Sequence, residues 1–122
     1  MTDADTALSQ NLEFYRAFST RDLAAMDRLW AREAAVSCIH PGWAPLAGRD
    51  EVLASWRAIL TGPSPPTVLC FDERATLFDG VAMVVCEEQL ETVSLAATNL
   101  FVMENGLWRM VHHQSSQIVQ RS

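Results

Sequence analysis

Residues 68–116 read VLCFDERATLFDGVAMVVCEEQLETVSLAATNLFVMENGLWRMVHHQSS, and this stretch decides the fold. Apolar and polar side chains alternate along most of it, which is typical of β-strands that bury one face. Asp79-Gly80 and Asn105-Gly106 are two-residue hairpin signals, because both residue types tolerate the left-handed backbone of such turns. The pattern predicts an antiparallel meander of strands at residues 68–78, 81–91, 95–104 and 107–116.

The chain before this meander has the apolar spacing of amphipathic helices. Ser19 stands three residues before Asp22, in the pattern of a capping box that would open a short second helix. Arg49 is expected to be solvated at the start of a third helix. The predicted elements are helices over about 3–18, 23–30 and 49–60, and a short strand at 35–40. The expected fold class is therefore α+β, with three N-terminal helices on the concave face of a bent, mainly antiparallel sheet.

The hairpin turns also predict which residues lie opposite one another. Asp79-Gly80 and Asn105-Gly106 set the two outer hairpins, and we place the middle turn at Val93-Ser94. Because directly opposite residues share a face, this register aligns a carboxylate, an amide and an imidazole on a mostly apolar face. The row is Phe71, Glu88, Asn99 and His112, and the next row ends in Gln114.

Glu88 is the candidate that this alignment singles out. A carboxylate on an apolar face must be paired, protonated or hydrogen-bonded. Burial raises the pKa of such a carboxyl group and a nearby imidazolium lowers it, so Glu88 and His112 are expected to exchange a proton. Asn99 would orient a substrate oxygen, and Phe71 and Phe101 would form walls. The structural alternative is that these polar residues bond only to one another and fix the register of the sheet.

The opposite face of the predicted sheet is half apolar. Residues 81–86 are apolar on both sides of the strand, and strands of that kind are normally covered on both faces. The helices cover only one face, so we expect a homodimer that forms through the outer face of the sheet.

Composition excludes several classes of partner. The 122 residues carry 15 acidic and nine basic side chains, for a net charge of −6, which argues against nucleic acid and anionic membranes as partners. No apolar run approaches the ~20 residues of a membrane span, and the polar N-terminus does not resemble a signal peptide. The length predicts one domain over residues 1–122.

Cysteine usage and glycine spacing bear on location and cofactors. Three widely spaced cysteines, Cys38, Cys70 and Cys86, are expected to be reduced thiols, which favours a cytoplasmic location. No glycine-rich phosphate loop and no closely spaced ligand motif is present, so neither a cofactor nor a metal is expected.

Several motifs give the chain a family resemblance. The segments SCIHPGW (residues 37–43), LAGRD (residues 46–50), Ser55-Trp56 and NGLWRMVHH (residues 105–113) resemble the SnoaL-like branch of the nuclear transport factor 2-like superfamily. The last segment also resembles the association domain of calcium/calmodulin-dependent protein kinase II. The resemblance implies a cone-shaped fold in which the bent sheet wraps the helices and encloses a pocket.

The resemblance also implies candidate residues and two classes of function. The position that matches the catalytic tyrosine of ketosteroid isomerase is Phe14, and the position of its aspartate base is His40, so His40 becomes a candidate base. At the position that matches Asn99, the kinase association domain has a pocket arginine, so the neutral amide implies a less anionic ligand, or none. The candidate catalytic residues are Glu88, His112 and His40, and the candidate substrate-binding residues are Asn99, Tyr15, Trp43, Trp56, Phe71, Phe101 and Gln114.

The predicted function is a pocket for a small hydrophobic ligand. Its chemistry would be acid–base isomerisation, dehydration or cyclisation of a hydrophobic carbonyl compound. The alternative is a non-catalytic ligand-binding or dimerisation module that resembles a kinase association domain.

Overall fold

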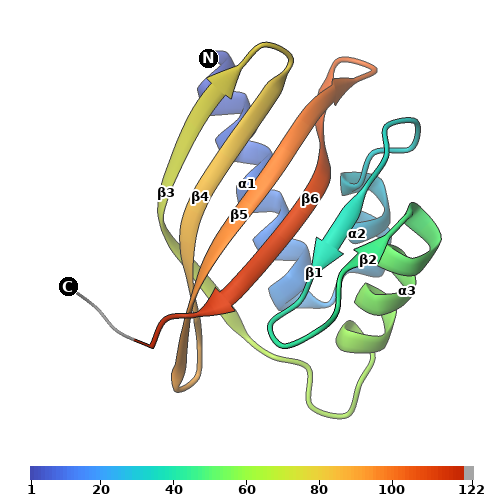
Figure 1. Cartoon of the computed structure of the whole chain (residues 1–122), viewed down its shortest axis with the longest axis vertical. Helices are drawn as coiled ribbons and strands as arrows, with labels where there is room; N and C mark the ends of the chain where they lie inside the picture. Colours follow the sequence, from blue (N-terminus) through green and yellow to red (C-terminus); the bar gives the residue numbers. More distant parts are fainter. Residues whose placement is uncertain (120–122) are drawn as a thin grey trace.

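The structure of the chain is a computed structural model that describes residues 1–119 (Figure 1). The end of the expected domain, residues 120–122, lies outside this description. The elements are α1 (Asp3–Thr20), α2 (Leu23–Leu29), β1 (Ser37–Ile39), β2 (Leu46–Ala47), α3 (Arg49–Leu60), β3 (Val68–Phe78), β4 (Val81–Leu90), β5 (Val93–Glu104) and β6 (Leu107–Gln117). The predicted α+β class with three helices is confirmed.

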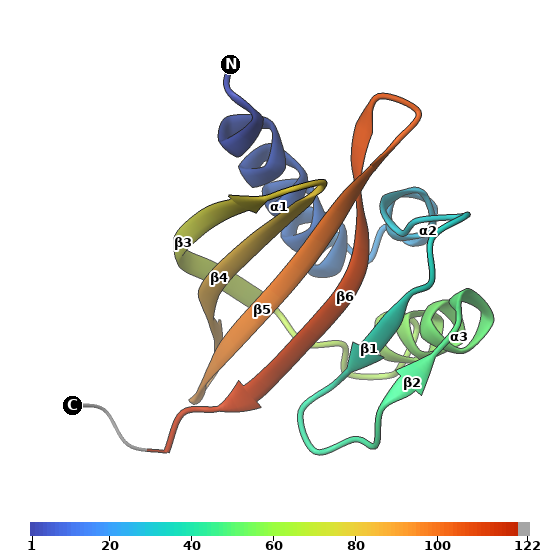
Figure 2. The ribbon, with the colours of Figure 1, turned by 45° about the horizontal axis from the view of Figure 1, so that its top comes forward.

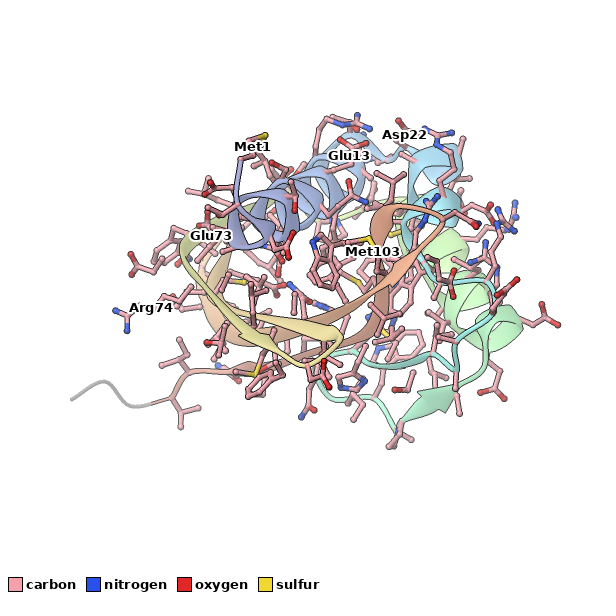
Figure 3. The ribbon with its side chains drawn as sticks, turned by 90° about the horizontal axis from the view of Figure 1, so that it is seen from above. Met1, Glu13, Asp22, Glu73, Arg74 and Met103 are labelled. Carbon is pink, nitrogen blue, oxygen red and sulfur yellow. The ribbon has the colours of Figure 1, made fainter. Side chains whose placement is uncertain are left out.

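The strands form one six-stranded sheet in the order β2-β1-β6-β5-β4-β3. β1 runs parallel to β6, and the other neighbouring pairs are antiparallel. The sheet bends around α1, which crosses its concave side, while α2 and α3 lie beside β1 and β2 (Figure 2). Viewed from above, α1 lies in the curve of the sheet and Arg74 of β3 points away from it (Figure 3). This is the cone shape that the resemblance implied.

Large apolar side chains from α1, α3 and the sheet meet inside the cone. Phe14 of α1, Trp56 of α3 and Phe101 of β5 are among the largest fully buried side chains. The rings of Phe14 and Trp56 pack edge to face with 5.4 Å between centroids. This contact ties α3 to α1, so the loop after β1 and the end of the sheet are held close to the same helix.

Local hydrogen bonds at the helix ends differ from the sequence prediction. The capping box lies at the start of α1, where Thr2 and Asp5 bond each other's backbone N–H at 3.1 Å. Asp22 alone caps α2, and the predicted role of Ser19 is wrong, because Ser19 lies within α1 and its hydroxyl donates to the carbonyl of Val68 at 2.8 Å. Ser19 therefore joins α1 to the start of β3 and takes no part in the cap of α2.

Arg49 is also placed differently from the prediction. Its guanidinium donates to the backbone carbonyls of Asp27, Trp30 and Ala31 and to the Asp27 carboxylate at 2.8–3.2 Å. Arg49 thus fastens the start of α3 to the end of α2 instead of extending into solvent.

The two outer hairpins turn at the predicted positions, but the middle hairpin does not. Leu90 pairs with Val93, so the turn lies at Glu91-Thr92 and not at Val93-Ser94. The partner of Glu88 becomes Leu95 instead of Asn99. This is a shift of four residues, and because side chains alternate with period two, Glu88 and Asn99 still share the inner face.

Two β-bulges change the predicted row. One lies in β3 between Phe71 and Arg74, and the other lies in β6, where Val111 is the extra residue between the partners of Phe101 and Leu100. An extra residue reverses the alternation beyond it. Phe71 and His112 therefore lie on the outer face, which contradicts their predicted place in the row.

The residues next to them take the inner positions. Cys70 is now opposite Glu88, and His113 is opposite Asn99. The side chain of Gln114 is exposed, so the prediction that it lines the pocket is wrong as well.

No helix in residues 1–119 is long and apolar enough to cross a membrane.

Candidate functional site

A pocket of about 350 Å³ opens between α3, the loop after β1 and the ends of β4, β5 and β6. Its volume lies within the range of small-molecule sites. Most of its walls are apolar and include Phe18, Trp43, Trp56, Ile59, Leu90 and Leu95. The ionisable and hydroxyl side chains in its lining are His40, Glu88, His113, Ser64 and Ser115.

Glu88 lies on the inner face of β4 and is only 2% exposed. The Tyr15 hydroxyl donates a 2.6 Å hydrogen bond to its Oε2, and Ser115 supplies a second hydrogen bond. Burial raises the pKa of the Glu88 carboxyl, and these two hydrogen bonds counter part of that effect. Glu88 is therefore a carboxyl group that takes up a proton more readily than one in water.

His113 faces Glu88 across the polar end of the pocket. The Nε2 atom of His113 lies 3.9 Å from Glu88 Oε2, beyond hydrogen-bond distance. Its Nδ1 lies 2.5 Å from the Asn99 Oδ1, and because that oxygen only accepts, Nδ1 carries the proton. The unprotonated Nε2 of His113 is thus directed at the carboxyl group.

Hydrogen bonds of the amide nitrogen fix the orientation of the Asn99 side chain. Its amide nitrogen donates to Asn11 Oδ1 at 2.8 Å and to the Tyr15 hydroxyl at 3.2 Å. The whole group is buried, so burial lowers the pKa of His113 to about 3 and the ring is neutral at neutral pH. Neither Asn99 nor Tyr15 lines the pocket, although both were predicted to bind substrate; each instead bonds to a side chain that does line it, His113 or Glu88.

His40 is a second neutral imidazole in the pocket. Its Nε2 lies 2.9 Å from the Ser55 hydroxyl oxygen, whose own proton goes to the Val52 carbonyl at 2.6 Å. Nε2 of His40 is therefore the donor, and Nδ1 carries the lone pair. Burial lowers the pKa of His40 to about 4. The rings of Trp43 and Trp56 each pack edge-on against it with 4.8 Å between centroids.

The structure brings together some of the predicted site residues. Glu88, His40, Trp43 and Trp56 line one pocket, and Tyr15 and Asn99 bond to the polar side chains at its inner end. Trp43 is 46% exposed and lies at the mouth. Trp56 is buried, and its indole N–H has no hydrogen-bond partner within the described part of the chain.

Other predicted residues lie elsewhere. His112 is on the outer side of β6, where its Nδ1 meets the Ser37 hydroxyl at 2.7 Å. Phe71 and Gln114 do not line the pocket because of the bulges, and Phe101 is buried in the apolar core. Three residues that contribute to the site were not predicted from the sequence: His113, Ser115 and Asn11. A signal for His113 was present in the sequence. Two consecutive residues on a strand point to opposite faces, so one ring of the pair His112 and His113 must face inward.

Residues 1–119 contain no cluster of three or more histidine, cysteine, aspartate or glutamate side chains arranged to hold a metal ion. The chemistry that the site itself offers is proton transfer between a carboxyl group with a raised pKa and imidazoles with free nitrogen lone pairs.

We expect the fold to lose stability as the pH falls below about 6.5. The pKa values of His40 and His113 are about 4 and 3 in the fold, against 6.5 when unfolded, so in this window the unfolded chain binds more protons. Each histidine contributes a slope of at most about 1.4 kcal/mol per pH unit. Glu88 acts in the opposite sense, because its raised pKa favours the protonated folded form.

Urea unfolding between pH 7 and pH 4.5 measures this effect. The His40→Asn variant should show a shallower decline in the free energy of unfolding than the wild-type chain. Parallel declines in the two proteins would contradict burial of His40 in its neutral form.

Comparison with known proteins agrees with the fold of the chain. Residues 8–120 match the SnoaL-like domain family. A provisionally named dehydratase of the NTF2-like family from Streptomyces avermitilis has a crystal structure that superposes with a TM-score of 0.88, at 28% identity over 97% of each chain. A provisionally named calcium/calmodulin-dependent protein kinase type II association domain from Thiobacillus denitrificans is 30% identical over 93% of this chain and 95% of its own, with a TM-score of 0.83.

One curated relative is a plant protein. F-box protein SKIP8 of Arabidopsis thaliana is 32% identical over 111 residues, which are 89% of this chain and 48% of that protein. The chain thus spans about half the length of this relative. Because the family match covers nearly the whole chain and the fold agrees, the chain belongs to the SnoaL-like family of NTF2-like domains.

Proposed function

We propose that the chain is an acid–base enzyme that isomerises, dehydrates or cyclises a small hydrophobic carbonyl compound. The observation that carries this proposal is the placement of Glu88 and His113, 3.9 Å apart, at the polar end of an otherwise apolar pocket. Perturbed titratable groups that face each other in a cavity are typical of catalytic sites. The similarity to the Streptomyces dehydratase supports the same class of reaction.

In this proposal Glu88 is the general base. Its carboxylate would remove the proton from the carbon next to the substrate carbonyl, and its raised pKa favours holding that proton until it is returned to a second atom of the substrate. The Tyr15 hydroxyl steadies the carboxylate throughout. The partnerless indole N–H of Trp56 is the candidate donor to the carbonyl oxygen, where charge develops in the transition state.

The two histidines would serve as proton acceptors on different sides of the substrate. Their ring centroids are 6.4 Å apart, and each ring is neutral with one unprotonated nitrogen, Nε2 in His113 and Nδ1 in His40. A dehydration needs a base for the carbon-bound proton and a group that delivers a proton to the leaving hydroxyl. In this proposal Glu88 does both: its carboxylate takes the carbon-bound proton, and the protonated carboxyl then gives that proton to the leaving hydroxyl, which departs as water.

Exchange of carbon-bound hydrogen tests this function without knowledge of the natural substrate. The chain would be incubated in D₂O with small hydrophobic ketones such as 2-heptanone, and deuterium at the carbon next to the carbonyl would be followed by proton NMR. We expect exchange faster than in buffer alone and its loss in the Glu88→Gln variant. If neither exchange nor binding occurs with any ketone, the proposal is wrong.

The second candidate function is a binding or assembly module without catalysis. The observation that favours it is the similarity to the Thiobacillus association domain, which extends over 93% of this chain. In that case ketones would bind the pocket with no exchange of hydrogen in either the wild-type chain or the Glu88→Gln variant.

We also propose that two copies pair through the outer face of the sheet. This face carries an apolar group: Val85 is 42% exposed, and the half-buried residues Met83, Leu100 and Val102 lie to one side of it, while its cross-strand partners are Arg74 and Thr98. These side chains lie on neighbouring strands, since Met83 pairs with Leu100 in the β4–β5 ladder. A second copy would remove this surface from water.

The Val85→Arg variant is expected to be monomeric where the wild-type chain is dimeric, because it places two like charges in the proposed interface. Sedimentation velocity at micromolar concentration measures the change. Leu12→Arg is the matched control, since Leu12 is exposed on α1 away from the sheet and its replacement should leave the dimer intact. A wild-type monomer would contradict the proposal.

A further inference from the structure

A second cavity adjoins the pocket at the open end of the cone. Its volume is about 380 Å³, and it shares Pro41, Leu90 and Leu95 with the first pocket. The remaining lining comes from Gly42, Val93, Ser116 and Gln117. The two cavities share three lining residues and therefore lie side by side; together they are called the groove, with an inner and an outer compartment.

The chemistry of the groove changes along its length. On the inner face of β4, Glu88 is followed by Leu90, and in the neighbouring strand Leu95 is followed, toward the turn, by Val93. Residues two apart on a strand lie about 7 Å from each other, so the apolar compartment begins one such step beyond the carboxyl group. The carboxyl and imidazole side chains therefore lie in the inner compartment, and the outer compartment is lined by apolar residues together with Ser116 and Gln117.

The loop on the other side of the outer compartment leaves it open. Gly42 has a φ of +81°, and no atom lies within 4 Å of the place where a Cβ would stand. Together, Pro41 and Gly42 form a smooth wall opposite the β4–β5 hairpin. A ligand that extends from Glu88 past Leu90 would reach the space between this loop and the hairpin.

We propose that the ligand is an elongated amphiphile, with a carbonyl group at its inner end and an unbranched or conjugated hydrocarbon tail in the outer compartment. This inference rests on the proposed function for the position of the carbonyl group and goes beyond it in naming the shape of the substrate. A compact ketone would occupy the inner compartment alone and leave Val93 in contact with water.

A homologous series of 2-alkanones from five to thirteen carbons tests this inference. Dissociation constants would be measured by the fluorescence of the tryptophans that line the inner compartment, Trp43 and Trp56. We expect affinity to increase up to about four-fold for each added methylene group while the tail fills the outer compartment, and then to level off. Affinity that stops increasing at the shortest ketones would overturn the inference.

Variants at the hairpin separate this inference from the proposed function. Val93→Trp should fill the outer compartment, so long ketones would bind no more tightly than short ones, while short ketones keep their affinity within about two-fold. Ser94→Trp is the matched control, because Ser94 lies next along β5 and points to the opposite face. The same length dependence in Val93→Trp and in the wild type would overturn the inference.

The proposed function has its own outcome in this experiment. Hydrogen exchange on short ketones without any effect of length would support the proposed function and overturn the elongated substrate. Absence of binding by every member of the series would overturn both.

Discussion

Replacement of Glu88 by glutamine is expected to reduce turnover of a carbonyl substrate by about 10²–10⁴-fold, the range that a general base contributes. The melting temperature should change little, because an amide has nearly the same shape as a carboxyl group. Its oxygen still accepts the hydrogen bond of Tyr15, and its nitrogen can donate toward Nε2 of His113. The measurements are the rate of hydrogen exchange on a ketone and thermal unfolding of the same samples.

Glu87→Gln is the matched control for this prediction. Glu87 is the preceding residue on β4 and lies on the outer face, opposite Phe71. The same chemical change there should leave the rate at the wild-type value. A Glu88→Gln variant that exchanges hydrogen as fast as wild type would show that the carboxyl group is not the base.

Replacement of Asn99 by alanine is expected to produce the largest loss of stability, about 2–4 kcal/mol. The change removes the acceptor of His113 Nδ1 and the donor to Asn11 Oδ1, and both of those atoms belong to fully buried side chains. A buried polar group without a partner carries the full cost of its lost hydration. For a chain of this size the melting temperature should fall by roughly 10 °C.

Thr98→Ala is the control for Asn99→Ala. Thr98 is the neighbouring residue on β5 and is half-buried on the other face. Its replacement should lower the melting temperature by much less. Equal effects at the two positions would indicate that Asn99 contributes by its volume and not by its hydrogen bonds.

The elements of the fold could be predicted from the sequence because their signals are local. The turns at Asp79-Gly80 and Asn105-Gly106 and the three helices depend on residues close in the chain. The middle turn has no such residues, since Glu91-Thr92 carries no glycine or asparagine, and it was placed two residues too late. That error left Glu88 and Asn99 on the correct face because it displaced the pairing by an even number of residues.

The bulge in β6 could not be predicted, because an extra residue on a strand leaves no mark in the alternation until the partners are known. The bulge in β3 had one signal, since the predicted register sets the like charges of Asp72 and Glu87 opposite each other, and the structure pairs Glu87 with Phe71 instead. Asp72 adopts a φ of +56° in β3. Aspartate tolerates this left-handed backbone, but the presence of an aspartate does not predict it. A displacement of one residue exchanges faces, so the prediction placed His112 and Phe71 inside when His113 and Cys70 belong there. The contributions of Asn11 and Ser115 depend on packing between α1 and the sheet, which has no local signal.

The extra residue in β6 lies directly before two consecutive histidines, and this has a consequence for how the chain tolerates insertions and deletions. Loss of Val111 would remove the bulge and make the ladder regular, with His112 still opposite Leu100 and His113 still opposite Asn99, so the imidazole of His113 would still face Glu88. Loss of Asp72 or Glu73 would remove the bulge in β3 in the same way and leave Cys70 opposite Glu88. Each bulge is therefore a point at which the chain can lose one residue while the side chains that face Glu88 and Asn99 keep their places.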